Sequence, residues 1–573
     1  MRIIQRQPSG NEQMLPADFH PVLRRAYAAR GIASARELDR SLGSLLPMDL
    51  LGGLADAVAL LARALQQQQQ LLIVGDFDCD GATSCALAVL ALRAMGCARV
   101  DYLVPNRFDY GYGLTPEIVE LAQERNPDLI ITVDNGISSI AGVRAANQAG
   151  IPVIVTDHHL PGDQLPDAAA IVNPNVPGDP FPGKATAGVG VIFYLLLGLR
   201  AHLRERNWFE QQQLAEPNMA DYLDLVALGT VADVVPLDTN NRILVHQGLA
   251  RIRAGHCRPG ITALLQVAGR NPASASAGDM GFAVGPRLNA AGRLDDMSLG
   301  IECLLADSMQ QARDLAGRLD AMNRERRQIE EDMGRQARAI LEDWPLQDET
   351  GLPWGLCLYD ENWHQGVIGI LASRIKERYR RPVIIFARGD AGEVRGSARS
   401  VKGLHIRDAL DEIAARQPGI LIKFGGHAMA AGMSLAVESL PEFMRLFDQL
   451  VRQRLSADDM RAVVLSDGEI QPGMLNLELA GLIADGGPWG QAFPEPVFDG
   501  VFSIVSQRVL KDKHYKLVLQ AATGTQLFDA IGFNLVEQHP APLPDRIRVA
   551  YQLDINEFRG NISLQLRIHS IES

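Results

Sequence analysis

The sequence predicts an α/β protein that begins with a parallel-sheet domain, continues through a long connecting helix into a second α/β domain, and ends in an OB-type β-barrel. Between residues 71 and 240, apolar runs alternate with helical patterns, which is typical of βαβ crossovers. From Met309 to Trp344 the chain lacks proline and is rich in helix formers. After about residue 460 the pattern changes to short alternating strands separated by turn residues, which favours a small barrel.

The composition is that of a globular enzyme rather than of a basic DNA-coating protein. A length of 573 residues suggests about four domains. The chain is 47% hydrophobic and 21% charged, and its net charge of −13 excludes a surface that is basic throughout. A nucleic-acid enzyme of this composition must therefore concentrate its lysines and arginines in a groove.

The cysteines and the N-terminus indicate the compartment. Six cysteines are scattered without a CxxC pair, which indicates reduced thiols in a cytoplasmic protein rather than disulfides or a zinc ribbon. The N-terminus carries no long apolar run, and no uncharged apolar stretch is long enough to span a bilayer. We therefore expect a cytoplasmic protein with no signal peptide and no membrane partner.

Domain boundaries are placed where these patterns change. The first residues form an N-terminal cap with a helical stretch through Leu38, followed by a helix that ends in the polar tract Gln66–Gln70. The long helix is either a solvated connector without chemistry or a spacer that sets the width of a channel between two lobes. The predicted domains are the cap (1–50), the parallel-sheet domain (51–305), the connecting helix (306–345), the second α/β domain (346–455) and the barrel (456–573).

Acidic residues and histidines follow the ends of four apolar runs that we interpret as buried strands. Because the carboxyl ends of parallel strands converge on one crevice, this pattern predicts a metal centre. Carboxylates with two adjacent histidines suit a divalent transition metal. The residues are Asp76, Asp78 and Asp80 after 71–75, Asp134 after 129–133, Asp157, His158 and His159 after 153–156, and Asp233 after 225–231.

Other interpretations compete with the metal centre. A single aspartate after a strand, such as Asp134 alone, is equally well a turn or helix-cap residue. The first motif resembles a calcium loop, but a strand precedes it and position 87 is Leu where that loop has Glu. Closely spaced carboxylates repel one another unless a cation neutralises them. Cys79 within the motif is better explained as a small packed side chain than as a ligand.

The two histidines are neighbours on an extended chain. Adjacent side chains of an extended segment point in opposite directions, so one imidazole can face one metal while the other faces a second metal or a phosphate. We expect Asp157 to orient one of the rings without binding metal itself.

Asp78, Asp80, Asp134, His158, His159 and Asp233 resemble, one by one, the motifs of the DHH phosphoesterase family. The resemblance implies a pair of divalent cations, Mn²⁺ preferred and Mg²⁺ as the alternative, with Asp134 as the bridging ligand. It also implies that the catalytic residues are Asp134, Asp157, His158 and His159. The chain departs from the pyrophosphatase branch, which has His four residues before the first of these aspartates, where this chain has Val74. Either the first metal is held less completely, or Asp76 contributes in place of that missing ligand.

The second α/β domain carries glycine-rich and arginine-rich segments. We expect strands at 355–359 and 382–386, and a loop that enters a helix at 364–374. Arginines four apart can fork onto phosphate oxygens, and glycines let a backbone approach a phosphate. By itself the Gly-Gly-His segment is more often a tight turn with a surface histidine. With a metal centre upstream, phosphate binding is the favoured interpretation.

The order of these segments resembles the DHHA1 domain that accompanies the DHH domain, in which a glycine-rich His motif and nearby arginines bind substrate phosphate. The predicted phosphate-binding residues are Arg287, Asn289, Arg293, His364, Gln365, Arg374, Arg395, Ser397, Arg399, Gly425, Gly426 and His427.

The barrel is expected to hold about five short antiparallel strands, including 501–505, 515–519 and 562–568. Cations and aromatic rings on two of its turns suit stacking on unpaired bases, although a charged hairpin is by default only a soluble edge. The predicted single-stranded-DNA-binding residues are Lys511, Lys513, Tyr515 and Lys516 on one hairpin, and Phe558 and Arg559 on another.

The three blocks together resemble the single-stranded-DNA exonuclease branch of the family. That resemblance implies 5′-to-3′ digestion of single-stranded DNA into 5′-mononucleotides in recombination and mismatch repair, by a monomer that meets a single-strand-binding protein and a repair helicase. One alternative is a phosphodiesterase of short oligonucleotides or cyclic dinucleotides, which would lack the long helix and the barrel. A second is a non-catalytic DNA-binding scaffold, which would be expected to lose metal ligands.

Overall fold

The computed structural model describes residues 2–7, 12–106, 110–342, 351–390, 392–461, 463–522, 525–558 and 560–572. Contacts divide the chain into two compact units. The larger comprises Gln5–Asn323 and Ser466–Ile571, so it holds most of the predicted cap, the parallel-sheet domain and most of the barrel. The smaller comprises Met1–Ile4, Arg324–Leu465 and Glu572–Ser573. The predicted long helix is present as α14 (Met309–Glu342), which carries the chain from the larger unit into the smaller.

The parallel sheet of the larger unit has the strand order β3-β2-β4-β5-β6. Every neighbouring pair is parallel, and the residues of β2, β4 and β5 are all buried, as expected for apolar runs covered on both faces. The chain leaves β2 for β3 on one side and returns to β4 on the other, which makes the β2–β4 gap a topological switch point. The strands are β2 (Leu71–Gly75), β3 (Val100–Leu103), β4 (Leu129–Val133), β5 (Val153–Thr156) and β6 (Ala170–Val172).

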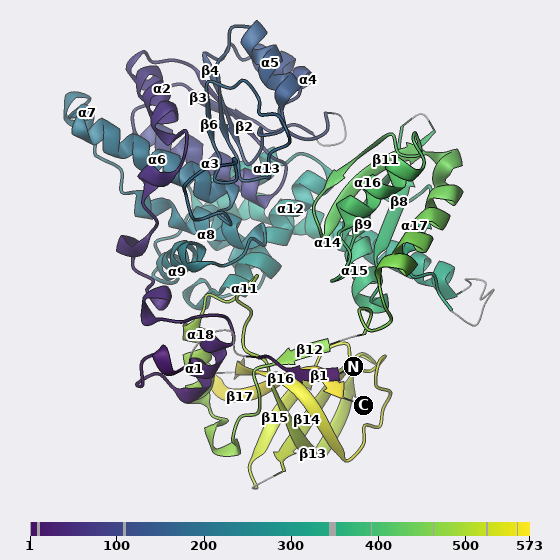
Figure 1. The fold of residues 1–573 in the computed structure, drawn as a ribbon. Coiled ribbons are helices and arrows are strands. Elements are labelled where there is room, and N and C mark those ends of the chain that lie inside the picture. The colour runs from purple at the N-terminus through teal and green to yellow at the C-terminus, as the bar shows by residue number, and fades with distance from the viewer. Residues whose placement is uncertain are drawn as a thin grey trace. The chain divides into compact units, whose positions relative to one another are not determined.

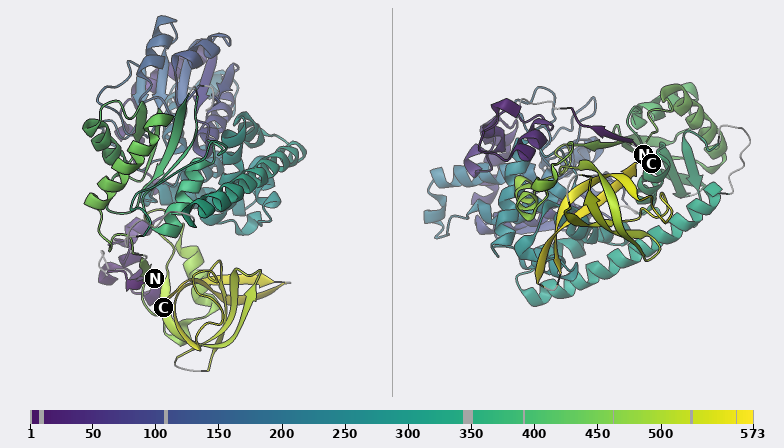
Figure 2. Two further views of the ribbon diagram at one scale, coloured as in Figure 1. Left: turned by 90° about the vertical axis from the view of Figure 1, so that its right-hand side faces the viewer. Right: turned by 90° about the horizontal axis from the view of Figure 1, so that it is seen from below.

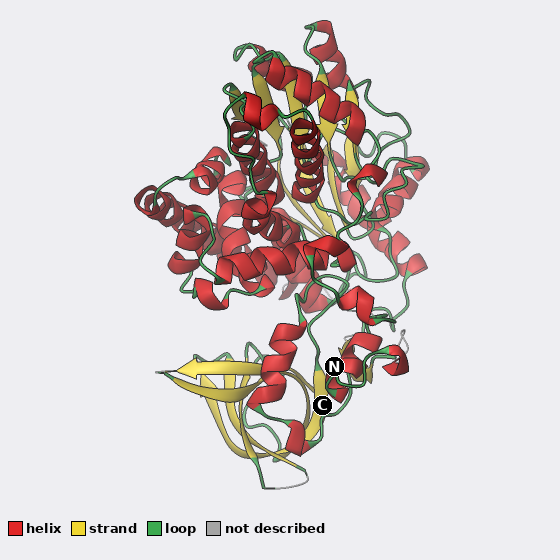
Figure 3. Cartoon of the chain, turned by 90° about the vertical axis from the view of Figure 1, so that its left-hand side faces the viewer, coloured by secondary structure: helices red, strands yellow, loops and turns green. Residues whose placement is uncertain are grey.

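Helices cover both faces of this sheet (Figure 1, Figure 3). Successive side chains of β2 point to opposite faces: Leu72 and Val74 join the apolar cluster of α4 and α5, whereas Leu71 and Ile73 join that of α2, α3 and α6. The two-sided burial explains why the sequence shows continuous apolar runs here. The covering helices are α2 (Leu54–Gln66), α3 (Cys79–Ala94), α4 (Pro116–Gln123), α5 (Ile140–Gln148) and α6 (Gly188–Glu205).

The predicted strand at 225–231 is wrong, because these residues form the helix α8 (Leu223–Ala232). A short and wholly buried apolar run has no periodicity that separates a strand from a helix. Helix α8 packs between α3 and α9. The helices of this part are α7 (Trp208–Gln211), α8, α9 (Thr239–Arg253), α10 (Pro259–Val267), α11 (Ala277–Asp279), the π-helical turn η7 (Met280–Val284), α12 (Gly285–Leu294) and α13 (Ser298–Leu305).

The N-terminal residues contact the segment that leads into the barrel. In α1 (Pro21–Ala28), the Tyr27 ring stacks on Trp489 with a centroid distance of 5.9 Å, and the Trp489 ring stacks on Phe493 at 5.0 Å. The Arg30 guanidinium forms a buried ion pair with Asp467 at 2.9 Å. The predicted cap therefore packs against the segment that precedes the barrel strands, which contains α18 (Leu477–Gly486).

The sheet of the smaller unit has the order β10-β11-β9-β8-β7, with β7 and β8 parallel and the other pairs antiparallel. Both strands predicted from sequence are present, as β7 and β8. The elements are β7 (Leu356–Tyr359), α15 (Ile368–Tyr379), β8 (Val383–Arg388), β9 (Glu393–Arg399), α16 (Ile406–Arg416), β10 (Lys423–Gly426), β11 (Ala430–Ala436) and α17 (Leu440–Arg454).

The C-terminal strands close into a barrel of order β13-β14-β15-β17-β16, as predicted for an OB-type domain (Figure 2, left). The expectation of short and purely antiparallel strands is wrong in two respects. Strand β15 pairs with β17 in parallel, and β13 runs for 13 residues with a bulge between Ile504 and Ser506. The strands are β13 (Phe498–Leu510), β14 (His514–Ala521), β15 (Leu527–Gly532), β16 (Arg546–Phe558) and β17 (Asn561–Glu572).

Short elements complete the described chain. No single helix of the described residues is long and apolar enough to cross a membrane, and only the bent pair Leu42–Leu50 with Leu54–Gln66 meets that test by length and composition. The remaining strands and 3₁₀ turns are β1 (Arg2–Gln5), β12 (Val463–Ser466), η1 (Glu12–Met14), η2 (Ala35–Leu38), η3 (Leu42–Ser44), η4 (Met48–Leu50), η5 (Met219–Tyr222), η6 (Pro272–Ser274), η8 (Val437–Ser439) and η9 (Pro472–Met474).

Candidate metal centre

The first acidic motif is a strand–turn–helix junction. Asp78 is the N-cap of α3, and its carboxylate accepts hydrogen bonds from the backbone N–H groups of Asp80 at 2.9 Å and Gly81 at 3.1 Å. A Cβ atom on Gly81 would lie 2.4 Å from the carbonyl oxygen of Asp76, so only glycine fits this tight turn. The turn places the carboxylates of this motif at the switch point of the sheet.

Asp80 is held by the N-terminus of a second helix. Its carboxylate is almost fully buried and accepts hydrogen bonds from the backbone N–H groups of Gly188 at 2.7 Å and Val189 at 2.9 Å, in the first turn of α6. The positive end of the helix dipole stabilises the buried negative charge. Gly188 is also close to Asp134, since a Cβ atom there would lie 2.6 Å from Asp134 Oδ1.

Asp134 occupies a strained backbone conformation at the end of β4. Its φ angle is +61°, in the left-handed region that residues other than glycine rarely adopt. The side chain is buried, and its Oδ1 atom accepts no hydrogen bond from any residue that the structure describes. A buried carboxylate oxygen without a donor fits a position that binds a cation.

The Asp-His-His segment brings two imidazoles to the same place. Asp157 is buried and accepts hydrogen bonds from the backbone N–H groups of Ile137, His158 and His159 at 2.7–3.0 Å. Its Oδ1 atom also lies 2.7 Å from His159 Nδ1, an arrangement that fits the predicted orienting role. The Nε2 atom of His158 lies 3.1 Å from Asp134 Oδ1.

Asp233 reaches the site from the C-terminal end of α8. Its Oδ2 atom lies 3.5 Å from His158 Nε2, and Asp80 Oδ2 lies 4.0 Å from the same nitrogen. A carboxylate at this end of a helix is disfavoured by the helix dipole, so it needs a compensating positive charge. The next residue, Val234, has a φ angle of +61°, which is rare for a β-branched side chain.

The ligand atoms fall into three groups, each with its atoms within 4.8 Å of one another. Asp134 belongs to two of the groups, and His158 also belongs to two, so the groups form one connected cluster. Carboxylate and imidazole ligands that share members fit a pair of divalent cations. The groups are Asp134 with His158 and His159, Asp80 with His158 and Asp233, and Asp76 with Asp78 and Asp134.

The raised pKa values of the clustered carboxyl groups reflect the crowding of negative charge in a buried place. Burial, together with the neighbouring Asp78 carboxylate, raises the pKa of Asp80 to about 7. Burial and the surrounding carboxylates raise the pKa values of Asp134 and Asp233 well above their usual range. For His159, burial lowers the pKa, but the hydrogen bond to Asp157 and its charge outweigh that effect and raise the pKa to about 9. Bound cations would replace these protons.

Tyr112 is a neighbour of the cluster that the sequence analysis missed. Its hydroxyl lies 3.3 Å from His159 Nδ1 and 3.3 Å from the carbonyl oxygen of Asp134. Gly111 and Gly113 on either side have φ angles of +77° and +75°, so the loop turns sharply around the tyrosine. The Gly-Tyr-Gly triplet is the sequence signal that would have revealed it.

Two predicted phosphate-binding residues of α12 are committed to contacts inside the fold. Arg287 is mostly buried, pairs with Asp320 at 2.9 Å and donates to the carbonyl oxygen of Ala283, and its phosphate contact stays a prediction. The side-chain oxygen of Asn289 accepts a hydrogen bond from the backbone N–H of Cys79 at 2.8 Å, which ties α12 to the first turn of α3. Arg293 lies in the last turn of α12, and its phosphate contact stays a prediction.

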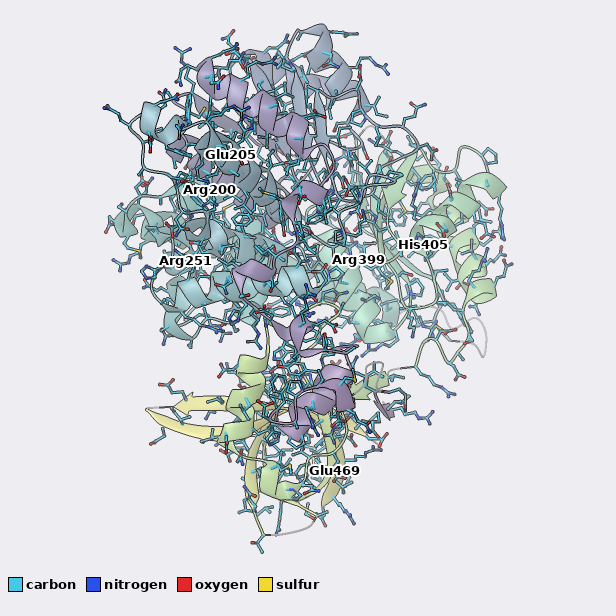
Figure 4. All side chains as sticks on the ribbon, turned by 60° about the vertical axis from the view of Figure 1, so that its left-hand side comes forward. Arg200, Glu205, Arg251, Arg399, His405 and Glu469 are labelled. Atoms are coloured by element: carbon cyan, nitrogen blue, oxygen red, sulfur yellow. The ribbon has the colours of Figure 1, made fainter. Side chains whose placement is uncertain are left out.

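In the smaller unit, Arg395, Ser397 and Arg399 lie on one face of β9. They alternate with the buried residues of the same strand, a period that places all three side chains on the partly exposed face. The guanidinium of Arg399, labelled in Figure 4, donates to Ser397 Oγ at 3.2 Å. A Cβ atom on Gly369 would lie 3.0 Å from both groups, so this glycine lets α15 approach them. The arrangement is compatible with anion binding.

The other predicted phosphate-binding residues of this unit lie nearby in sequence and make their own contacts. Gln365 accepts from Arg395 at 3.1 Å, and Arg374 pairs with Glu330 at 3.0 Å. His364 Nδ1 accepts from the backbone N–H of Gly366 at 3.1 Å. These contacts do not test phosphate binding.

The glycine-rich His segment is a hairpin rather than an open loop. Gly425 and Gly426 belong to the edge strand β10, and the backbone N–H of His427 donates to the carbonyl oxygen of Ala430 at 2.8 Å. The φ angle of Gly426 is +143°, and a Cβ atom there would lie 2.4 Å from that same carbonyl oxygen. The tight-turn interpretation is thus correct for the backbone, and phosphate binding by this hairpin stays a prediction.

On the barrel, the predicted stacking role of Tyr515 is wrong. The Tyr515 ring is fully buried in the barrel core, and its hydroxyl donates to the carbonyl oxygen of His539 at 2.7 Å. Lys511 and Lys513 lie in the exposed β13–β14 turn, and Lys516 pairs with Asp529 at 3.4 Å. Because side chains alternate along a strand, Tyr515 points into the barrel while its neighbour Lys516 points outward. Arg559 and the side chain of Phe558 lie outside the described residues.

Comparisons with known proteins identify the three blocks. Residues 70–230 match the DHH family N-terminal domain, residues 355–453 match the DHHA1 domain, and residues 466–570 match the RecJ OB domain. The chain is 53% identical to the single-stranded-DNA-specific exonuclease RecJ of Salmonella typhimurium, covering 100% of this chain and 99% of the relative. It is 54% identical to that of Escherichia coli, covering 97% and 96%.

Solved structures give the same result. The RecJ structure from Thermus thermophilus in complex with Mn²⁺ superposes with a TM-score of 0.82 at 31% identity, covering 100% of this chain and 79% of that one. The RecJ structure from the same organism in complex with Mg²⁺ superposes with a TM-score of 0.76 at 29% identity, covering 100% and 78%. Sequence identity over the full length of both chains, together with this fold, shows that the chain belongs to the RecJ family.

Proposed function

We propose that the chain is an exonuclease that hydrolyses single-stranded DNA 5′ to 3′ into 5′-mononucleotides, with a pair of divalent cations held by the cluster described above. One observation carries the proposal: carboxylates from three separate chain segments and two imidazoles meet in one partly buried cluster, where Asp134 and His158 each belong to two ligand groups. Full-length identity to relatives named single-stranded-DNA-specific exonucleases supports the substrate.

The residues that would hold the cations are Asp76, Asp78, Asp80, Asp134, His158, His159 and Asp233. A pair of cations supplies charge neutralisation on the phosphoryl group and a water of lowered pKa. The chain's own contribution is to fix the ligands before substrate binds, through the α6 N-terminus on Asp80 and Asp157 on His159. We propose Mn²⁺ as the preferred ion because imidazole ligands favour it over Mg²⁺.

The finer points of the proposal rest on the family. We propose that the protein works as a cytoplasmic monomer beside a single-strand-binding protein and a repair helicase, in recombination and mismatch repair. Free thiols at all six cysteines are consistent with a reducing compartment. The closed barrel distinguishes the chain from phosphodiesterases of short oligonucleotides, because such a domain offers an additional surface for a longer strand.

The test uses one long oligonucleotide labelled at its 5′ end or its 3′ end, alone or annealed as a blunt duplex, with Mn²⁺ and the full-length protein. The expected result is release of 5′-labelled mononucleotide from the single strand at the earliest times, gradual shortening of the 3′-labelled strand, and little cutting of the duplex. Equal rates on blunt duplex, or release of 3′-labelled mononucleotide first, would contradict the proposal.

A further inference from the structure

Two asparagines beyond the edge strand β6 contact the Asp-His-His segment. Strand pairing places them there: Thr156 lies opposite Val172, and the backbone N–H of Asp157 donates to the carbonyl oxygen of Val172 at 3.1 Å. Asn173 follows directly, and Asn175 comes two residues later, after Pro174. Asn173 is almost fully buried at 1% exposure, so its amide is part of the interior of the site rather than of the surface.

Each asparagine donates to the backbone carbonyl of one histidine. The side-chain amide of Asn175 donates to the carbonyl oxygen of His158 at 2.6 Å, and that of Asn173 donates to the carbonyl oxygen of His159 at 2.9 Å. The two asparagines are also tied together, because the Asn173 side-chain oxygen accepts from the backbone N–H of Asn175 at 2.8 Å. A second bond from the Asn175 amide to the carbonyl oxygen of Lys184, at 3.1 Å, anchors the pair to the next loop.

These contacts complete a four-point restraint on the histidine pair. The Asp157 carboxylate accepts from the backbone N–H groups of His158 and His159, and the two asparagine amides donate to their carbonyl oxygens. The segment has left strand β5 at Thr156, so these side chains provide hydrogen bonds that strand pairing provides elsewhere. Fixed peptide planes restrict where each imidazole can point.

The two histidines contribute unequally to the cluster. His158 belongs to the group with Asp134 and His159 and also to the group with Asp80 and Asp233. His159 belongs only to the first of these. A disturbance of His158 therefore reaches both groups, whereas a disturbance of His159 reaches one.

We propose that Asn173 and Asn175 are positioning residues of the metal centre, with Asn175 setting the imidazole shared by two ligand groups and Asn173 setting the imidazole that serves one. The inference rests on the two-cation function proposed above. Each asparagine amide donates to a histidine carbonyl, so each acts through the histidine that it holds. Substitution of a residue that holds a metal ligand in place typically weakens metal affinity by about 10- to 100-fold.

The test is a Mn²⁺ titration of the full-length protein, in which the electron paramagnetic resonance signal of free Mn²⁺ reports stoichiometry and affinity. The variants are Asn173→Ala, Asn175→Ala and the control Asn147→Ala. Asn147 also donates its amide to a backbone carbonyl, that of Asp167 at 2.8 Å, but belongs to none of the ligand groups. Circular dichroism and thermal unfolding without Mn²⁺ establish that each variant is folded.

The wild-type protein and Asn147→Ala are expected to bind two Mn²⁺ ions. Asn173→Ala should keep one ion at wild-type affinity and weaken the other at least about tenfold, while Asn175→Ala should weaken both. A purely structural role would lower the unfolding midpoint without Mn²⁺ and leave both affinities unchanged, which would overturn the inference. Equal weakening in the two variants would overturn the assignment of one histidine to each asparagine.

Failure of the proposed function looks different. A wild-type protein that binds no Mn²⁺ would overturn the two-cation function, and the inference with it, before any variant is compared. If an alanine variant does not fold, the paired Asn173→Asp and Asn175→Asp variants repeat the titration, since they keep the side-chain size and remove the amide donor. Wild-type affinities in folded aspartate variants would overturn the inference.

Discussion

The two five-stranded sheets of this chain present polar side chains in different ways. In the parallel sheet, the candidate ligands other than Asp233 follow the carboxyl ends of β2, β4 and β5, and Asp233 joins them from the end of α8. In the mixed sheet, Arg395, Ser397 and Arg399 lie along one face of the single strand β9. The first arrangement gathers buried carboxylates from distant positions, and the second lines up cations from neighbouring positions.

The two kinds of site depend on the fold in different ways. A site at strand ends depends on the positions of several loops, so one added atom in a loop can displace ligands from another segment. A site on a strand face depends mainly on the alternation of one strand, so a single side chain can be removed with local consequences. The variants below test that contrast.

The largest effect is expected for Asp134→Ala in the parallel sheet. Asp134 belongs to two of the three ligand groups, so its loss should abolish hydrolysis of single-stranded DNA while largely preserving strand binding. Gel assays and fluorescence anisotropy measure the two properties separately. Asp163→Asn, at an exposed loop position, is the control and should behave as the wild type. Residual cleavage by Asp134→Ala would show that the metal assignment is wrong.

Gly188→Ala should have the next largest effect, although it removes no ligand. The added Cβ atom would lie 2.6 Å from Asp134 Oδ1, so either Asp134 or the start of α6, which holds Asp80, must move. We expect Mn²⁺ affinity to fall about 10- to 100-fold, as measured by titration calorimetry. Gly278→Ala in α11 is the control, because the nearest atom to an added Cβ there lies at an ordinary 3.5 Å. Unchanged affinity in Gly188→Ala would mean that the cluster tolerates displacement.

Arg399→Ala tests the strand-face site. If the exposed face of β9 binds phosphate, KM for 5′-phosphorylated single-stranded DNA should rise about tenfold, while kcat changes less. The substitution leaves Ser397 on β9 and Gly369 on α15 unchanged. The control is Arg407→Ala, an exposed arginine of α16. An unchanged KM would remove β9 from the substrate site.

The protonation of the cluster predicts an effect of pH on stability. Because the pKa of Asp80 is raised to about 7 in the fold, its protonated form contributes stability below its unfolded pKa of about 4, and this contribution is lost as pH rises through 7. Protein without metal should therefore unfold at a lower temperature at pH 8 than at pH 5.5, and Mn²⁺ should raise the midpoint more at pH 8. Calorimetric scans with and without Mn²⁺ measure both. Equal Mn²⁺ shifts at the two pH values would contradict the raised pKa.

The smallest effects are expected on the barrel, where loss of the turn lysines should change DNA affinity and loss of the Tyr515 hydroxyl should change stability. Removal of Lys511 and Lys513 should weaken single-stranded-DNA binding about two- to threefold and reduce its salt dependence. Tyr515→Phe should leave DNA affinity unchanged and lower the free energy of unfolding by about 1 kcal/mol, because it removes the partly buried hydrogen bond to the carbonyl oxygen of His539. Weaker DNA binding by Tyr515→Phe would restore the stacking role rejected above.

The sequence alone was sufficient where the chemistry depends on the ends of central strands. The apolar runs before Asp76 and Asp134 were correctly predicted to be buried parallel strands, and their convergence followed from topology. It was insufficient at Asp233, because a short buried apolar run reads equally as strand or helix. It was also insufficient at Tyr515, because alternation along a strand does not say which of the two faces is buried. The contacts of Asn173 and Asn175 could not be predicted, because they depend on the register of an edge strand.

The two-cation metal centre is tested most directly by anomalous X-ray diffraction from crystals of the full-length protein grown with Mn²⁺. Two manganese peaks are expected among the ligand groups of Asp134, His158 and Asp80, with Asp134 in contact with both ions. No peak there, or a single ion that Asp134 does not touch, would rule out a two-cation centre bridged by Asp134.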